Sequence, residues 1–212
     1  MTAAQKPNWK KAALGAALGA VAGFAAMFAF MHWGGGDELE ALSGDRIVLA
    51  AEGLVYLLTG MFVGFGLLAP RAGAKVLNVE DAEELDEMRP HLTRSSIVIA
   101  LIGALLLLLS ASGPGGYVGD TLVLGATALV VVAASVLTWQ ANRAYDELWR
   151  QLSNEGAAAT LALLMPTVLV WGVLAHLGRL PFTPLGVIAL LAALVLVGAY
   201  IAAGRRGMLT PK

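Results

Sequence analysis

The sequence predicts an all-α integral membrane protein in which six transmembrane helices form three consecutive hairpins, with short amphipathic cytoplasmic helices between them. Of its 212 residues, 58% are apolar and only 14% are charged, and the mean hydropathy is +0.75. A soluble domain carries about 25% charged residues. The apolar residues also gather in six runs, and one polar motif occurs twice, each time just before such a run. We expect residues 1–212 to form a single membrane domain.

The six apolar runs supply the predicted spans. The first follows Lys10 and Lys11 and has a length of about 20 residues, or about 30 Å as a helix, which exceeds the apolar part of a secretory signal. Pro70 is expected to end the second helix and Pro166 to kink the fifth, because proline has no amide hydrogen. The predicted spans are residues 12–31, 47–69, 96–111, 121–139, 157–177 and 185–203.

A short polar motif precedes two of these runs. LDEMRPHLT at residues 85–93 reappears as YDELWRQLS at residues 145–153, with an Asp-Glu pair, then an apolar residue, then Leu before Thr or Ser. Such self-similarity predicts a duplicated unit, a short amphipathic segment outside the membrane followed by two spans. We expect the helix of the fourth span to continue past the lipid until Asn154 and Gly156 end it.

The largest polar segment, residues 71–94, is expected to be a cytoplasmic loop with a short amphipathic helix from Asn78 to Pro90. Six carboxylates lie between Glu80 and Glu87, but their spacing matches no calcium loop, so a solvated helix face is the favoured interpretation. Their other role would be to meet a basic partner. The residues predicted to form this partner surface are Glu80, Glu83, Glu84 and Glu87.

The positions of lysine and arginine predict the orientation. If the amino terminus is cytoplasmic, twelve of the 14 basic residues lie inside, and only Arg46 and Arg179 lie outside. Cytoplasmic loops of membrane proteins carry an excess of such residues. Both termini and both copies of the motif are therefore expected in the cytoplasm, and the bacterial inner membrane is the expected location.

Glycines mark the helix faces expected to pack closely. Gly15, Gly19 and Gly23 repeat every four residues in the first span, a pattern that lets helix backbones approach in lipid. Gly60 and Gly64 mark the corresponding face of the second span. The alternative is that glycine and alanine only fill a span of low complexity.

Glu52 is the one formal charge inside an apolar run. It lies about 9 Å along the helix from Arg46, and a carboxylate at that depth costs about 2.5 kcal/mol or more unless it is paired, protonated or hydrated. Tyr56 shares its helix face, and the expected cationic partners are His176, Arg179 and, locally, Arg46. One interpretation is a structural pair that fixes how two spans pack. The other is a protonation site that ion movement could switch.

The sequence excludes thiolate chemistry and contains no motif for the common catalytic, metal-binding or nucleotide-binding sites. The chain has no cysteine, which excludes thiolate sites, and no basic stripe for nucleic acid. No hydrolase, metalloprotease or nucleotide-binding motif is present, and the three histidines are too scattered to predict a metal or haem site, so we expect no cofactor. Two functions stay open: a non-enzymatic protein that associates with itself or with a larger membrane complex, and a small ion- or proton-coupled transporter or channel using Glu52. An enzyme acting on lipid is a third, weaker alternative.

Overall fold

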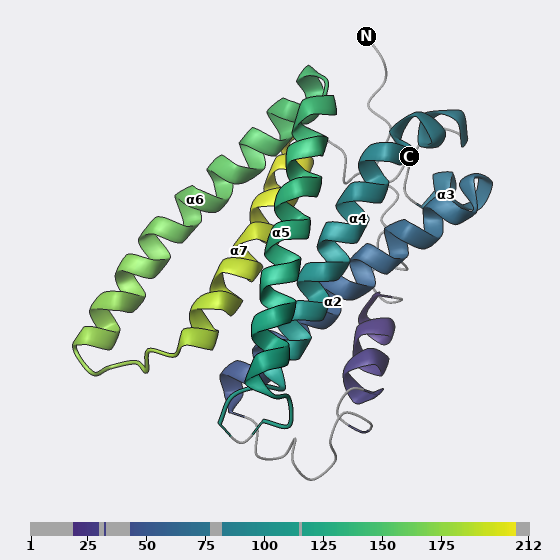
Figure 1. Ribbon diagram of the computed structural model, residues 1–212. Coiled ribbons are helices and arrows are strands. Elements are labelled where there is room, and N and C mark those ends of the chain that lie inside the picture. Colours follow the sequence, from purple (N-terminus) through teal and green to yellow (C-terminus); the bar gives the residue numbers. More distant parts are fainter. Residues whose placement is uncertain (1–18, 30–31, 33–42, 77–81, 115, 207–212) are drawn as a thin grey trace. The chain divides into compact units, whose positions relative to one another are not determined.

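The computed structural model describes residues 19–29, 32, 43–76, 82–114 and 116–206. In that part of the chain the elements are helices (Figure 1): α2 (Gly44–Leu68), α3 (Pro70–Val76), α4 (Ala82–Ser110), α5 (Asp120–Ala144), α6 (Glu147–His176) and α7 (Pro184–Arg205). Five of them, all but α3, are long and apolar enough to cross a membrane. The predicted all-helical class is thus confirmed. The first predicted span is described only in part, as the apolar helix Gly19–Ala29.

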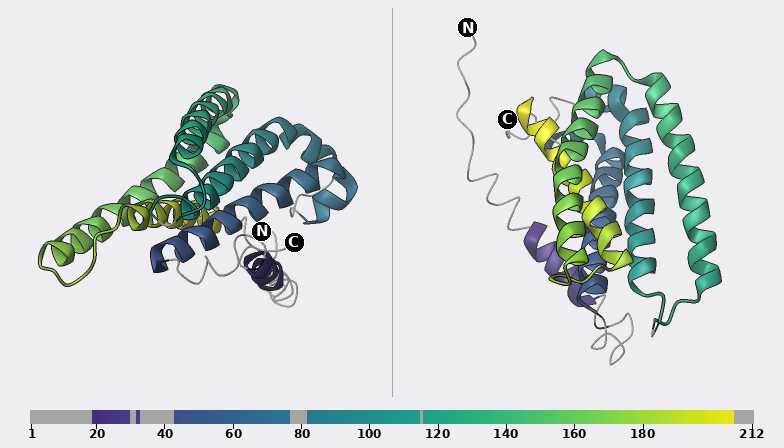
Figure 2. Two further views of the ribbon diagram at one scale, coloured as in Figure 1. Left: turned by 60° about the horizontal axis from the view of Figure 1, so that its bottom comes forward. Right: turned by 90° about the vertical axis from the view of Figure 1, so that its left-hand side faces the viewer.

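The chain divides into two compact units, Met1–Ala144 and Tyr145–Pro211. In the first unit α2 and α4 lie side by side in every view, and they run antiparallel (Figures 1 and 2). Glycines bring their backbones together: a Cβ on Gly103 would lie 2.5 Å from the Leu57 nitrogen, and one on Gly60 would lie 2.7 Å from the Ser96 carbonyl oxygen. Real Cβ atoms do not approach backbone so closely, so these two positions require glycine.

A small apolar core fixes the corner between α2, α3 and α4. α2 ends at Leu68 and α3 begins at Pro70, as expected for a residue that cannot donate a backbone hydrogen bond. Leu67, Ala74 and Leu85 are buried against one another, and Leu85 is only 1% exposed. The start of α4 is therefore held against α2 and α3.

The predicted helix end at Pro90 is wrong. α4 runs from Ala82 to Ser110 and contains Pro90, so the amphipathic segment and the third apolar run form one helix. Pro90 cannot donate to the carbonyl of Asp86, but Leu85 and Leu92, on either side of it, pack into the same core. This shared burial explains why one lost hydrogen bond does not end the helix.

The expected continuation of the fourth apolar helix to Asn154 and Gly156 is also wrong. α5 ends at Ala144, and a new helix, α6, begins at Glu147 and continues through Asn154 and Gly156. Asp146 caps this start by accepting a hydrogen bond of 2.9 Å from the Trp149 amide. α6 also continues through Pro166 without a break.

The second unit consists of α6 and α7 and their connection. A Cβ on Gly198 of α7 would collide with Thr160 Oγ1 and would lie 2.7 Å from the Gly156 carbonyl oxygen, and Thr160 Oγ1 donates to the Leu194 carbonyl at 3.3 Å. At the start of α6, Arg206 donates to both carboxylate oxygens of Glu155, at 2.6 and 3.2 Å. The two helices are thus joined by close backbone packing and by one bidentate ion pair.

The pKa of Glu155, which precedes the apolar run of α6, is lowered chiefly by the hydrogen bond from Arg206. A lowered pKa means that the pair contributes stability at neutral pH and loses it as the pH falls through that lowered value. Both side chains are partly exposed, so the contribution is small.

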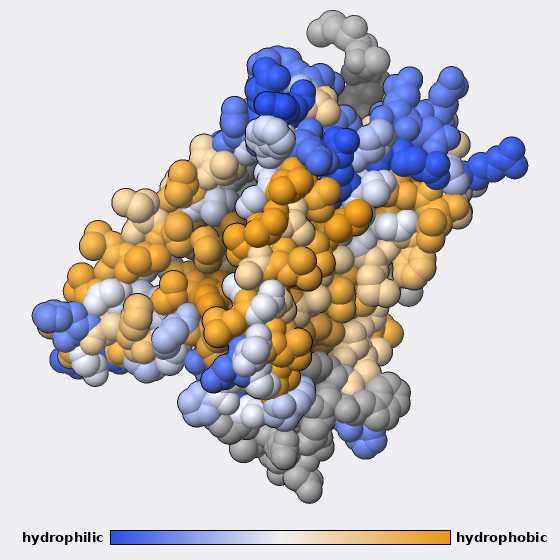
Figure 3. Space-filling view, in the orientation of Figure 1, coloured by the Kyte–Doolittle hydropathy of each residue, from blue (hydrophilic) through white to orange (hydrophobic). Residues whose placement is uncertain are grey.

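Side chains on the long helices are mostly apolar and outward-facing. In α6, all of whose residues are described, none is buried. Figure 3 shows hydrophobic residues along the length of α5 and hydrophilic residues at its two ends. This distribution suits a helix that crosses a bilayer, in which apolar side chains contact lipid tails.

Candidate functional site

Glu52 lies beside the seam between α2 and α4. Its neighbour Gly53 faces α4 directly, since a Cβ there would lie 2.9 Å from the Leu107 nitrogen, and Tyr56, one turn further, is only 3% exposed. The Oε2 atom of Glu52 is buried and has no hydrogen-bond partner among the described residues. Thr59 does not donate a hydrogen bond to this oxygen, because the Thr59 hydroxyl donates to the Val55 carbonyl at 2.7 Å. An acidic oxygen is therefore held in an apolar seam.

Arg46 lies in the first turn of the same helix and binds a loop. The residue is 8% exposed, and its guanidinium donates from Nη2 to the carbonyl of Pro114 at 2.9 Å. Gly113, at φ +80°, lets the loop turn there, and a Cβ on it would lie 3.2 Å from the same nitrogen. Arg46 thus ties the start of α2 to the loop between α4 and α5, a role that the sequence did not reveal.

The other predicted partners of Glu52 belong to the second unit. His176 is the last residue of α6, and Arg179 lies in the following turn, where its amide donates to the Leu174 carbonyl at 2.9 Å. The pairing of Glu52 with His176, Arg179 or Arg46 stays a prediction.

The predicted partner surface lies on the first turns of α4. Glu83, Glu84 and Glu87 are exposed, while Glu80 lies outside the described residues. Carboxylates in a first turn are favoured by the positive end of the helix dipole. Leu85 is buried on the opposite side, so the three carboxylates stand on a helix face whose position is fixed by packing.

The glycines predicted to pack fall into two groups. Gly60 meets the α4 backbone, whereas a Cβ on Gly64, Gly19 or Gly23 would meet nothing within 4 Å among the described residues, and Gly15 lies outside them. The close contact predicted for the first span therefore stays a prediction. Sequence reasoning missed Gly103 and Gly198. Each is an isolated glycine in an apolar run, which is the signal that could have found it.

Among the described residues, no group of three histidine or carboxylate side chains could hold a metal ion. Comparison with family models, curated proteins and solved structures finds no match for this chain. The described residues define the class: a helical protein with five helices long and apolar enough to cross a membrane, compatible with a multi-pass membrane protein.

Proposed function

We propose that the chain is a six-span protein of the bacterial inner membrane that has no catalytic role and acts by association, either with itself or with a larger membrane complex. The observation that carries this proposal is the acidic face at the start of α4, which the exposed residues Glu83, Glu84 and Glu87 form. Leu85 is buried on one side, and Arg89 donates from Nη2 to the Leu67 carbonyl at 2.6 Å, so Glu83, Glu84 and Glu87 are presented in a fixed arrangement. A basic partner surface would complement it.

The orientation that we propose places both termini and the acidic face in the cytoplasm, with the six spans arranged as three hairpins. The excess of lysine and arginine on that side supports it. The anionic cytoplasmic leaflet would repel the carboxylates of the acidic face and turn them toward the cytosol.

Single cysteines test this orientation, because the chain contains no native cysteine. Glu87 and Tyr117 are exposed at opposite ends of the hairpin that α4 and α5 would form. We expect a membrane-impermeant maleimide to label Tyr117→Cys in intact cells and to label Glu87→Cys only after the membrane is opened. Labelling of both in intact cells, or the reverse pattern, would contradict the topology.

The association itself is tested by neutralising the acidic face. The variant Glu83→Gln, Glu84→Gln and Glu87→Gln keeps size and helix propensity but removes three charges. Exposed ion pairs contribute roughly 0.2–1 kcal/mol each, so we expect a complex about three- to hundred-fold weaker. Complexes purified in mild detergent would be measured by size-exclusion chromatography and mass spectrometry.

Glu147→Gln is the matched control, because Glu147 occupies the position of Glu87 in the second copy of the motif. It should leave the complex intact. Recovery of the wild-type protein alone and monomeric at every salt concentration would contradict an association function.

A second candidate function is a small ion- or proton-coupled transporter or channel. The Oε2 atom of Glu52 favours it, because this atom is buried without a hydrogen-bond partner in the part of the chain that the structure describes. An ionisable group inside a membrane span often marks a pathway or a proton site. The apolar composition of the spans opposes it, since few polar groups are available to line a path.

A further inference from the structure

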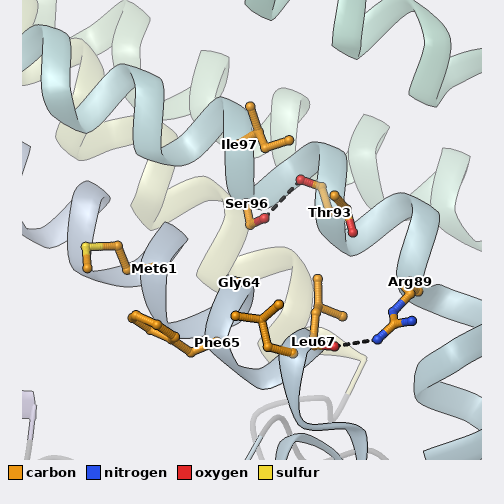
Figure 4. A pocket seen from close by; sticks show the side chains of 9 residues that line it. Met61, Gly64, Phe65, Leu67, Arg89, Thr93, Ser96 and Ile97 are labelled. Carbon is orange, nitrogen blue, oxygen red and sulfur yellow. Dashed lines mark hydrogen bonds between the residues drawn. The ribbon is translucent and has the colours of Figure 1, made fainter.

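A groove of about 570 Å³ opens between the last turns of α2 and the part of α4 that follows Pro90 (Figure 4). Its walls are mainly apolar, with Met61, Gly64 and Phe65 from α2 and Ile97 from α4. Phe65 is 63% exposed and Ile97 43% exposed, so the groove opens on the outer surface of this helix pair. A lipid chain could enter it from the side.

One end of the groove is polar and charged. Arg89 lies there, and its guanidinium is oriented by the hydrogen bond from Nη2 to the Leu67 carbonyl, drawn in Figure 4. Its Nε lies 3.7 Å from Asp86 Oδ1, and both side chains are about half exposed. The groove therefore ends at Arg89, and Asp86 lies beside Arg89 just outside the groove lining, with both side chains accessible.

The polar groups follow one another along α4 in a definite order. Ile97, Thr93 and Arg89 line the groove in that order along α4, and Asp86 follows three residues before Arg89, outside the groove lining. With a rise of 1.5 Å per residue, Ile97 and Arg89 are about 12 Å apart along the axis, and Asp86 lies about 4.5 Å beyond Arg89. A phospholipid has the same order: hydrocarbon chain, ester-linked glycerol, phosphate, then the headgroup amine.

We propose that this groove binds one phospholipid with a phosphoethanolamine headgroup in the cytoplasmic leaflet. The phosphate pairs with Arg89, the primary ammonium pairs with Asp86, and an acyl chain lies between Met61, Phe65 and Ile97. The proposal rests on the membrane insertion and orientation proposed above.

Charge complementarity selects this headgroup. An anionic phosphoglycerol lipid could offer Asp86 only neutral hydroxyl donors, and its net negative charge would be repelled by the carboxylates of Glu83, Glu84 and Glu87 on the same helix end. A choline headgroup carries a quaternary ammonium that cannot donate a hydrogen bond to a carboxylate. The phosphoethanolamine headgroup complements both members of the pair, because its phosphate pairs with Arg89 and its primary ammonium pairs with Asp86.

Native mass spectrometry of the full-length protein, with phosphatidylethanolamine, phosphatidylcholine and phosphatidylglycerol of identical acyl chains, tests the proposal. We expect the ethanolamine lipid to bind at least about tenfold more tightly than the other two. Asp86→Asn should remove the preference over phosphatidylcholine, and Arg89→Gln should weaken all three lipids. Arg150→Gln is the matched control, since Arg150 forms a pair of the same i, i+3 spacing with Glu147, at 3.6 Å, in α6, and both of its side chains are more exposed than those of the Arg89–Asp86 pair.

A second variant separates lipid binding from folding. A Cβ on Gly64 meets nothing within 4 Å, so Gly64→Leu should keep the helix packing but fill the groove and abolish the preference. Equal binding of the three lipids to the wild type, or an unchanged preference in Gly64→Leu, would overturn the lipid site. Alkaline extraction of membranes separates failure of the lipid site from failure of the proposed membrane insertion. Release of the protein would overturn both. Retention of the protein in the membrane, together with equal binding of the three lipids, would overturn the lipid site alone.

Discussion

Replacing Gly103 by alanine is expected to force α2 and α4 apart and to lower the stability of the first unit by about 1–3 kcal/mol. The added Cβ would lie 2.5 Å from the Leu57 nitrogen and 2.7 Å from the Gly53 carbonyl oxygen. Both are backbone atoms, so no side chain can rotate away, and the helices must separate. In lipid this costs dispersion contacts, which are a main source of helix association. Thermal unfolding of the purified protein in detergent measures the effect.

Gly64→Ala is the matched control for this experiment. It makes the same substitution in α2, where a Cβ has open space. Alanine is a better helix former than glycine by roughly 0.5–1 kcal/mol, so Gly64→Ala should leave stability unchanged or raise it slightly. If the two variants unfolded at the same temperature, the close approach of α2 and α4 at Gly103 would be refuted.

Replacing Glu52 by glutamine is expected to abolish any proton-linked ion flux through the protein in liposomes, a fall of at least about tenfold, while the protein stays folded. Glutamine keeps the shape and the hydrogen-bonding capacity of the side chain but cannot carry a proton on and off. The Oε2 atom of Glu52 has no hydrogen-bond partner among the described residues, so the substitution removes no hydrogen bond from that atom. Flux is followed with a pH-sensitive dye inside the liposomes.

Glu87→Gln serves as the control, because Glu87 is an exposed carboxylate at the start of α4 and lies outside the apolar part of that helix. It should leave the flux unchanged. Flux that survives Glu52→Gln would end the transporter alternative for this residue. A wild-type protein that carries no flux would leave the association function as the better account.

The candidate site shows which of its features can be predicted from the sequence and which cannot. Glu52 could be singled out from the sequence because a carboxylate in an apolar run is costly wherever its neighbours lie. Its surroundings could not be deduced, since they depend on contacts between residues far apart in the chain. Arg46, for example, binds the carbonyl of Pro114, 68 positions away, a contact that no spacing in the sequence indicates.

The sequence by itself determined the helical class and the approximate bounds of the long helices. Residues 47–69 and 185–203 were predicted as helical, and α2 and α7 occupy Gly44–Leu68 and Pro184–Arg205. An apolar run of such length has one favourable state in lipid, because a helix satisfies all its backbone hydrogen bonds within the segment. That preference is local, so it can be read from composition and spacing.

Only the tertiary structure decided which glycines matter and where helices continue. Gly64 belongs to a glycine pattern that predicted packing and Gly103 does not, yet a Cβ on Gly103 would meet a backbone and one on Gly64 would meet open space. Pro90 lies within α4 because Leu85 and Leu92 share a core with residues of α2 and α3. These outcomes depend on long-range contacts, whose free energy outweighs the local preferences of glycine and proline.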